Sequence, residues 1–318
     1  MCSIGELAQS AGVTVKTVRF YSDRGLLPEA CRSAGGHRRY GPEAADRLRL
    51  IRSLRALGLP VPDVRRVLDE EAAGERALED AVAGQLREVA SGLKALRWRE
   101  AGLRLVQECP PGERAERLRL VGAVTAAPST DVLVRFWRAW LPARMPAGAA
   151  AQFLEAAVPQ PPDEPAPGQV LAFARLCALV AAPCTGGAPP QPHAHHEAGA
   201  RGAAVLYGGL AEAYELAAVA LRRNGAPQPG EALDCFVAAY ASAYGTRDSA
   251  GFRRRLAGQL GSDPRLDRYW ELVAEVVTPP GGRPEPTAGV AHDWLLAALT
   301  APAAAPAAAP AGRGSGAG

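Results

Sequence analysis

A run of basic and hydroxyl-bearing side chains lies near the start of the chain, and its chemistry suits a surface that binds phosphates. Lysine and arginine neutralise phosphate charge, while hydroxyl and imidazole groups add hydrogen bonds to a nucleic-acid backbone or to base edges. The residues concerned are Thr14, Lys16, Thr17, Arg19, Tyr21, Arg32, His37, Arg38, Arg39 and Tyr40. Between Thr14 and Arg66 there are 12 basic and 5 acidic residues, a net charge of +7, against +3 for the whole chain. We therefore expect this segment to bind a polyanion.

Two short helices must position the first of these residues. Ser3 and Glu6 form a Ser-x-x-Glu capping box that starts one helix, and Gly12 ends it. Thr14 can cap a second helix, which Gly25 ends. In a helix-turn-helix unit of this kind the second helix enters the DNA major groove. The side chains expected to point inward from the second helix are Val15, Val18 and Phe20.

A predicted hairpin follows the two helices. The glycine pair at Gly35 and Gly36 precedes the basic and aromatic run that begins at His37. Such a pair allows a tight turn, and the run behind it can lie along a phosphate backbone. The sequence therefore predicts a small β wing.

The spacing of these residues resembles that of the MerR family of transcription regulators. The matching patterns are T-V-R-F-Y-x-x-x-G-L-L-P and then R-x-x-x-G-H-R-x-Y, and the match covers roughly the first 70 residues. One departure is Ser22, where an acidic residue is more usual, but Asp23 follows it. The resemblance implies a homodimer that binds a palindromic operator in double-stranded promoter DNA. It also implies that the protein distorts this DNA to control RNA polymerase holoenzyme.

One long helix is predicted from residue 75 to residue 107. Its apolar residues are spaced by 4, 3, 4, 3 and 7 positions, which is a heptad seam with charged flanks. The seam residues are Val82, Leu86, Val89, Leu93, Leu96 and Leu103. A single helix with such a seam needs a partner, and the resemblance implies an antiparallel coiled coil between two copies. The alternative is packing against the C-terminal part of the same chain.

The rest of the chain is interpreted as helical, because no stretch after Tyr40 shows strand alternation. The expected fold is therefore mostly α, with a winged helix-turn-helix, a long antiparallel coiled-coil helix and an all-α C-terminal domain. The Ala/Pro/Gly composition after Thr300 predicts a disordered tail. The expected domains are 1–74 for DNA binding, 75–109 for dimerisation, 110–300 for effector sensing and 301–318 for the tail.

Aromatic side chains in the C-terminal region are the candidates for an effector pocket, because aromatic walls with a few hydroxyls suit an apolar, drug-like ligand. They are Trp137, Trp140, Tyr207, Tyr214, Tyr240, Tyr244, Tyr269 and Trp270. The alternative for each is an ordinary core position. The helical arrangement faintly resembles the antibiotic-recognition domain of TipA-type MerR proteins, without any residue assignment.

Histidine and cysteine side chains leave metal and redox roles open. Three histidines share a Pro-rich loop with Cys184, but that loop offers no rigid second shell for zinc. These histidines are His193, His195 and His196. Cys2 and Cys31 lie near the expected DNA-contact elements, so a redox response is another possibility. We expect no bound metal and no cofactor, and the scattered cysteines suit a cytoplasmic protein with reduced thiols.

The sequence shows no phosphate loop, G-x-S-x-G, H-E-x-x-H or dinucleotide fingerprint, so no enzymatic activity is expected. No apolar run reaches the ~18 residues of a membrane span, and no secretion signal is visible. We expect no membrane partner and a cytoplasmic, nucleoid-associated location in a bacterium. The expected function is a dimeric DNA-binding regulator that responds to a small molecule. The alternatives are a drug-sequestering protein that mainly regulates its own expression and a redox- or metal-responsive regulator.

Overall fold

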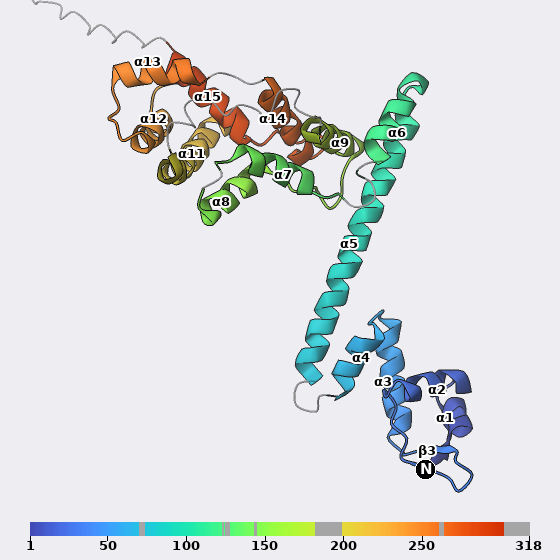
Figure 1. The fold of residues 1–318 in the computed structure, drawn as a ribbon. Helices are drawn as coiled ribbons and strands as arrows, with labels where there is room; N and C mark the ends of the chain where they lie inside the picture. Colours follow the sequence, from blue (N-terminus) through green and yellow to red (C-terminus); the bar gives the residue numbers. More distant parts are fainter. Residues whose placement is uncertain are drawn as a thin grey trace, which may run out of the picture. The chain divides into compact units, whose positions relative to one another are not determined.

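The computed structural model describes residues 1–69, 74–122, 124, 128–142, 145–181, 199–260 and 264–301. The chain divides into two compact units, Met1–Lys94 (unit 1) and Ala95–Gly318 (unit 2). The boundary falls inside α5 (Gly74–Glu108), which Figure 1 draws as one continuous helix. As predicted, the fold is mostly α with a small N-terminal sheet. The division of roles among DNA binding, dimerisation and sensing stays a prediction.

The helix caps predicted for the start of unit 1 are present in the structure. The Ser3 side chain accepts from the Glu6 backbone N–H, and the Glu6 carboxylate accepts from the Ser3 N–H at 2.7 Å. Thr14 caps the next helix by accepting from the Thr17 N–H at 3.1 Å. Gly25 follows that helix with φ +72°, a conformation that L side chains rarely adopt. The elements before α5 are β1 (Cys2–Ser3), α1 (Ile4–Ser10), α2 (Val15–Asp23), β2 (Cys31–Arg32), β3 (Arg38–Tyr40), α3 (Ala44–Ala56) and α4 (Val61–Asp69).

The three strands form an antiparallel sheet in the order β1-β3-β2. Cys2 lies opposite Tyr40, and Cys31 lies opposite Arg39. The hairpin between β2 and β3 is the predicted wing, and its turn contains Gly36 at φ +77°. Strand β1 was not predicted, because two residues are too few to show alternation.

The core of unit 1 is formed where α1, α2, α3 and α4 meet beside the sheet. Val18 of α2, Ile51 of α3 and Val64 of α4 are fully buried in it, and so is Tyr40 of β3. Ala81 of α5 joins the same cluster. Helix α2 and the wing are thus attached to one apolar core, which fixes their backbones for any external contact.

Unit 2 is a set of helices, as the sequence predicts. After α5 it continues with the 3-10 turn η1 (Pro111–Glu113) and α6 (Arg114–Gly122). The others are α7 (Asp131–Trp140), α8 (Ala147–Ala157), α9 (Pro167–Ala181), α11 (Gly199–Arg222), α12 (Glu231–Ala243), α13 (Ala250–Gln259), α14 (Pro264–Val277) and α15 (Ala288–Thr300).

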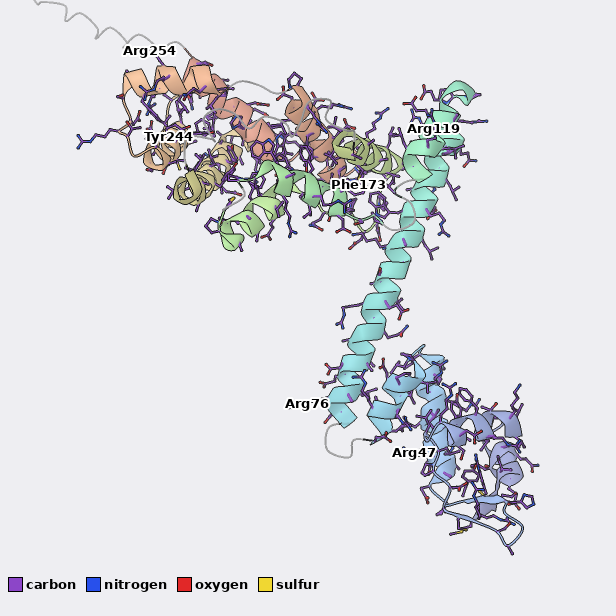
Figure 2. All side chains as sticks on the ribbon, in the orientation of Figure 1. Arg47, Arg76, Arg119, Phe173, Tyr244 and Arg254 are labelled. Atoms are coloured by element: carbon purple, nitrogen blue, oxygen red, sulfur yellow. The ribbon has the colours of Figure 1, made fainter. Side chains whose placement is uncertain are left out.

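The core of unit 2 includes one face of the second part of α5. Trp98 is fully buried, and its indole N–H donates to the Pro162 carbonyl at 2.9 Å. Its ring packs edge-on against Phe173 of α9, which is labelled in Figure 2. Gln169 is a buried polar residue whose amide donates to the Val276 and Thr278 carbonyls. These contacts join α5, α9 and the end of α14 in one packed body.

Helix α11 corrects the expectation that no segment is long and apolar enough to cross a membrane. By length and composition, Gly202–Arg222 passes that test, with 33% of the tested window buried. Leu206, Leu210 and Ala213 of this helix are buried in the core of unit 2. Gly209 meets Ala239 of α12 so closely that an added Cβ would lie 2.6 Å from the alanine methyl. Helix α11 is therefore a core helix of this unit, paired tightly with α12.

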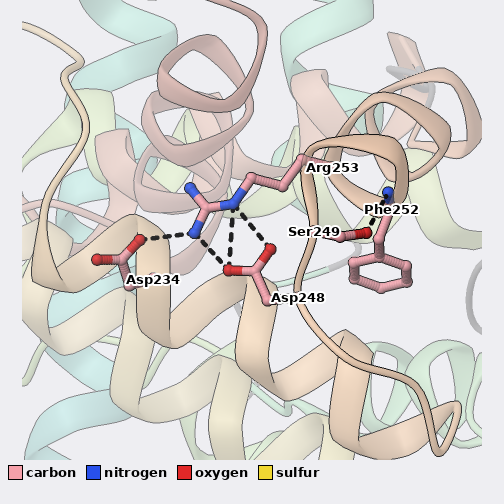
Figure 3. Close-up of polar contacts among 5 residues, drawn as sticks. All are labelled: Asp234, Asp248, Ser249, Phe252 and Arg253. Atoms are coloured by element: carbon pink, nitrogen blue, oxygen red, sulfur yellow. Dashed lines mark hydrogen bonds and ion pairs between the residues drawn. The ribbon is translucent and has the colours of Figure 1, made fainter.

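Arg253 of α13 forms ion pairs with Asp248, in the turn after α12, and with Asp234 of α12 (Figure 3). We call these three residues the Arg253 cluster. Arg253 contacts Asp248 at 2.5 Å and Asp234 at 2.7 Å. These contacts lower the pKa of Asp248 and raise the pKa of Arg253. Ser249 caps α13 by accepting from the Phe252 N–H. The cluster has a structural explanation, because it holds the turn that joins the two helices.

Candidate DNA interface

Helix α2 presents its charged residues to the outside. Lys16 and Arg19 are exposed, and no carboxylate lies within ion-pair distance of either among the described residues. Thr14 and Thr17 lie at the start of the helix with their hydroxyl oxygens 2.9 Å apart. The Thr14 oxygen already accepts from the backbone as the helix cap, so Thr17 has the freer hydroxyl for an external contact.

The inward face of α2 differs from the prediction. Val18 is fully buried, as predicted, but Val15 and Phe20 are 40% and 42% exposed. Tyr21, which the sequence placed at the DNA interface, is 9% exposed and packs in the core. Positions 18 and 21 are three residues apart and share a helix face, whereas position 20 lies away from it. The prediction for Val15 and Phe20 was therefore wrong.

Phe20 is instead an exposed aromatic group on α2. The Arg24 guanidinium lies 4.6 Å from the centre of its ring, and the Tyr21 ring meets it edge-on at 5.4 Å. A cation over an aromatic face is favourable even near solvent. This contact fixes Arg24 at the end of α2, next to the exposed charges of the helix.

The wing carries its residues on two faces. In an antiparallel sheet directly opposed residues share a face and successive residues alternate. Arg39 therefore shares a face with Cys31, while Arg38 and Tyr40 share the other. Tyr40 is fully buried, so its side chain does not point outward, whereas His37 in the turn is exposed.

Two wing arginines that the sequence placed at the DNA interface have carboxylate partners. Arg38 lies 2.6 Å from Asp23 of α2 and 3.1 Å from Glu29. Arg32 lies 3.0 Å from Glu29. The contact with Asp23 raises the pKa of Arg38, so this arginine keeps its charge at any ordinary pH. Asp23 and Glu29 were missed by the sequence analysis, although the acidic residue next to Ser22 was a usable signal.

Arginines of α3 are also directed inward. The Arg47 side chain, labelled in Figure 2, donates to the Leu26 carbonyl at 2.7 Å. Arg52 donates to the Ala11 carbonyl at the end of α1, and Arg55 donates to the Leu59 carbonyl. The carbonyls that accept these bonds lie at or just after the ends of α1, α2 and α3. Part of the +7 charge of this segment therefore supports the fold and is not free for a ligand.

The predicted seam of α5 is exposed along most of its length. Leu86, Val89, Leu93, Leu96 and Leu103 have exposures between 45% and 66%, while Val82 is half-buried. The opposite side of α5 is covered within each unit, by Ala77 and Ala81 in the first and by Trp98, Ala101 and Leu105 in the second. Five large apolar side chains on one exposed helix face indicate a contact surface.

The cysteine and histidine hypotheses find little support in the described residues. Cys2 and Cys31 lie on opposite faces of the sheet, so they cannot form a disulfide with each other in this fold. No group of three or more metal-ligating side chains occurs among the residues that the structure describes. The predicted loop with Cys184 lies outside those residues, as do its three histidines, His193, His195 and His196.

The eight aromatic residues proposed for an effector pocket form two packed groups in unit 2. Trp137 is central to the first, with Trp140, Phe153, Tyr269 and Trp270 within 5.7 Å of its ring. Tyr207 extends this group through the Phe153 ring. The second group contains Tyr214, Tyr240, Tyr244, Phe236, Phe252 and His292. In the described part of unit 2 these rings fill the core.

His292 is a half-buried group that the sequence analysis missed. Its Nδ1 lies 3.0 Å from the Tyr214 hydroxyl, and burial lowers its pKa to about 4. A pocket of about 260 Å³ lies elsewhere in unit 2, with Leu216, Val219 and Trp294 among its lining residues. None of the eight proposed aromatic residues lines that pocket.

Comparison with known proteins gives matches for part of the chain. Residues 2–71 match the family described as MerR HTH family regulatory protein. The chain is 40% identical over 114 residues to the HTH-type transcriptional activator TipA of Streptomyces coelicolor, and this match covers 33% of the chain and 45% of TipA. It is 41% identical over 86 residues to the nodulation protein NolA of a Bradyrhizobium species, covering 27% of the chain and 35% of NolA.

A third relative is covered over most of its length. The chain is 32% identical over 111 residues to the mercuric resistance operon regulatory protein of Bacillus cereus, covering 34% of the chain and 84% of that protein. By contrast, the chain spans less than half of the length of TipA and of NolA. The similarity therefore concerns about a third of this chain.

Proposed function

Because the chain belongs to the MerR family of transcription regulators, we propose that it binds promoter DNA as a homodimer through the outer face of α2 and the wing. The observation that carries this proposal is the pair Lys16 and Arg19, which are exposed on α2, while neighbouring arginines are bound to carbonyls or carboxylates. Exposed cations that contact phosphates displace counterions from the DNA, and this release supplies most of the non-specific affinity for DNA. Thr17, His37 and Arg39 would add contacts from the helix and the wing.

The proposed dimer uses the seam of α5. Its exposed leucines would be buried by the same face of a second copy, in an antiparallel pair. Closed two-fold symmetry then presents two copies of α2 to the two half-sites of a palindromic operator. Loss of the dimer would therefore halve the number of DNA contacts.

The proposed action on transcription is a change in DNA shape. A dimer that bends and untwists the promoter would align its elements for RNA polymerase. Such deformation costs on the order of 1–10 kcal/mol, which the phosphate contacts of both protomers must offset. A cytoplasmic location at the nucleoid is part of this proposal.

Unit 2 is proposed to sense a small-molecule effector. Its eight aromatic candidates are packed against one another in the described residues, so a ligand would have to separate them. Binding would then favour a rearranged state of unit 2 and shift the population towards it. A protein that only sequesters a compound would bind it without any change in transcription from the target promoter.

Selection of duplexes from a random-sequence pool by the full-length protein tests the proposal. We expect a palindromic sequence to be enriched. Arg19→Ala should lower affinity for it by about 10-fold, the loss of one or more good contacts per protomer. The matched control is Arg254→Ala on α13 of unit 2, which should leave affinity unchanged. No enriched sequence, or equal losses in both variants, would contradict the proposed interface.

A further inference from the structure

Four charged side chains join the wing to the end of α2, and we call this set the wing clamp: Asp23, Glu29, Arg32 and Arg38. Arg38 lies 2.6 Å from Asp23 and 3.1 Å from Glu29, and Arg32 lies 3.0 Å from Glu29. The clamp therefore runs without interruption from a helix carboxylate to both strands of the wing.

The positions of these residues in the chain give the clamp its effect. Asp23 is the last residue of α2, Glu29 lies between α2 and β2, and Arg38 begins β3. The Ala30 N–H also donates to the Arg39 carbonyl at 2.8 Å, which extends the pairing of β2 with β3. The wing hairpin has only two-residue and three-residue strands, and such a short ribbon is marginal without further contacts. Pairing of β3 with β1 and the buried Tyr40 hold the base of this hairpin, and the contacts between its side chains and α2 add to these in setting its orientation.

The charge balance of the clamp argues against a direct role of Arg38 on DNA. Two arginines and two carboxylates give a net charge of zero, so the clamp as a whole adds no attraction for a polyanion. The side chains of Arg38 and Glu29 are only 28% and 32% exposed, and a partly buried ion pair is screened less than a surface one. A phosphate could bind Arg38 only by displacing a carboxylate or by approaching one.

We propose that Asp23 is a positioning residue for DNA recognition, which holds Arg38 and thereby the wing at a fixed orientation to α2. This role rests on the proposed function, because orientation matters only if α2 and the wing read the same duplex. Asp23 follows Ser22, so the carboxylate that orients the wing stands one position later than the acidic residue usual in this family pattern. Sequence discrimination requires the two elements in register, whereas non-specific attraction requires only charge.

The specificity ratio is the quantity that separates positioning from charge. It is the dissociation constant for a random-sequence duplex divided by that for a duplex selected by the wild-type protein, both of equal length. Asp23→Asn removes a negative charge, so non-specific affinity should stay the same or rise. Loss of wing orientation should lower the ratio by about 10-fold, in the range of couplings between residues in direct contact. A reduced fraction of active protein changes both constants equally and leaves the ratio unaffected.

A double-mutant cycle in the full-length protein completes the test. Asp23→Asn should lower the ratio by about 10-fold, and Arg38→Gln by at least as much, because it also breaks the contact with Glu29. The double variant should lower the ratio no further than Arg38→Gln alone, because the Asp23–Arg38 contact is already lost in that variant. Asp23→Glu keeps the carboxylate and should retain most of the ratio. The matched control is Asp46→Asn, which breaks the exposed Asp46–Arg49 pair of α3 at 2.7 Å and should leave the ratio unchanged.

Two results would overturn the positioning role. One is a ratio unaffected by Asp23→Asn while the wild-type protein discriminates between the duplexes. The other is multiplication of the two single effects in the double variant, which would mean that Asp23 and Arg38 act independently. A wild-type protein that prefers no duplex would instead contradict the proposed function, and the positioning role with it.

Discussion

The two units of the molecule differ in whether their candidate functional side chains remain exposed. In unit 1 the arginines are sorted by their partners: Arg38, Arg47 and Arg52 bind carboxylates or carbonyls, while Arg19 stays exposed. In unit 2 the aromatic rings that could have lined a ligand pocket are packed in two groups, one of them around Trp137. Residue type alone therefore predicts more ligand-binding side chains than either unit has, because many of the predicted ones are engaged in internal contacts.

Because of this difference, substitutions in the two units should have different effects. The proposed functional side chains of unit 1 lie on its surface, so their removal should alter binding with little loss of stability. The proposed functional side chains of unit 2 are part of its core, so their removal should alter stability first. The predictions below test this contrast, beginning with the largest effect.

Trp137→Ala should destabilise unit 2 by about 4 kcal/mol, because it leaves a cavity among several aromatic rings. Denaturant unfolding followed by near-ultraviolet circular dichroism measures this loss. Leu118→Ala is the control, since Leu118 is 56% exposed and its removal should cost little. If the two variants unfold alike, Trp137 does not hold the core together.

Lowering the pH should weaken unit 2 through His292, by about 3 kcal/mol between pH 6.5 and 4. Burial lowers the pKa of His292 to about 4 in the folded protein, whereas its ordinary value is 6.5. The unfolded chain therefore binds a proton first as the pH falls, so this stability is complete above about 6.5 and is lost towards 4. Asp293, whose pKa burial raises, acts in the opposite direction.

Comparison with His292→Gln isolates the histidine contribution. That variant should show a flatter dependence of the free energy of unfolding on pH between 6.5 and 4, while Asp293 contributes equally to both proteins. Equal slopes in the two proteins would show that the pKa of His292 is not lowered in the folded protein.

Leu93→Asp should weaken the proposed dimer by about 2 kcal/mol or roughly 30-fold, because it places a charge in an apolar contact. Light scattering over a range of concentrations gives the dimer dissociation constant. Arg99→Asp, at another exposed position of α5, serves as the charge control and should have a smaller effect. A dimer that tolerates Leu93→Asp would place the interface elsewhere.

Arg253→Ala should lower the stability of unit 2 by about 1 kcal/mol, because two carboxylates lose a charge-assisted partner near solvent (Figure 3). The neighbouring Arg254→Ala should change stability by less than about 0.5 kcal/mol. Thermal unfolding of both variants measures the difference. Equal values would mean that the cluster does not hold the turn before α13.

The sequence was most informative where short-range signals act. The capping residues Ser3 and Thr14 and the helical repeat of α5 predicted helix positions to within a few residues. Strand β1 escaped prediction because it depends on pairing with β3, which lies far along the chain.

The candidate site was harder to predict than the fold, because it depends on tertiary contacts. The residue pattern located α2 and the wing, but it could not show that Phe20 points outward and Tyr21 inward. Nor could it show that Asp23 and Glu29 bind Arg38. Such choices depend on which helix face the remaining elements cover.

The salt dependence of DNA binding tests the central claim most directly. Full-length protein carrying Lys16→Gln and Arg19→Gln is compared with protein carrying Arg254→Gln and Arg255→Gln, so that each variant loses two exposed cations per protomer. If a dimer binds through α2, the first variant loses up to four phosphate contacts, and the slope of log K against log salt should fall by up to about 3.6. The second variant should keep the wild-type slope. An unchanged slope in the first variant, or an equal fall in both, would contradict the assignment of DNA binding to α2.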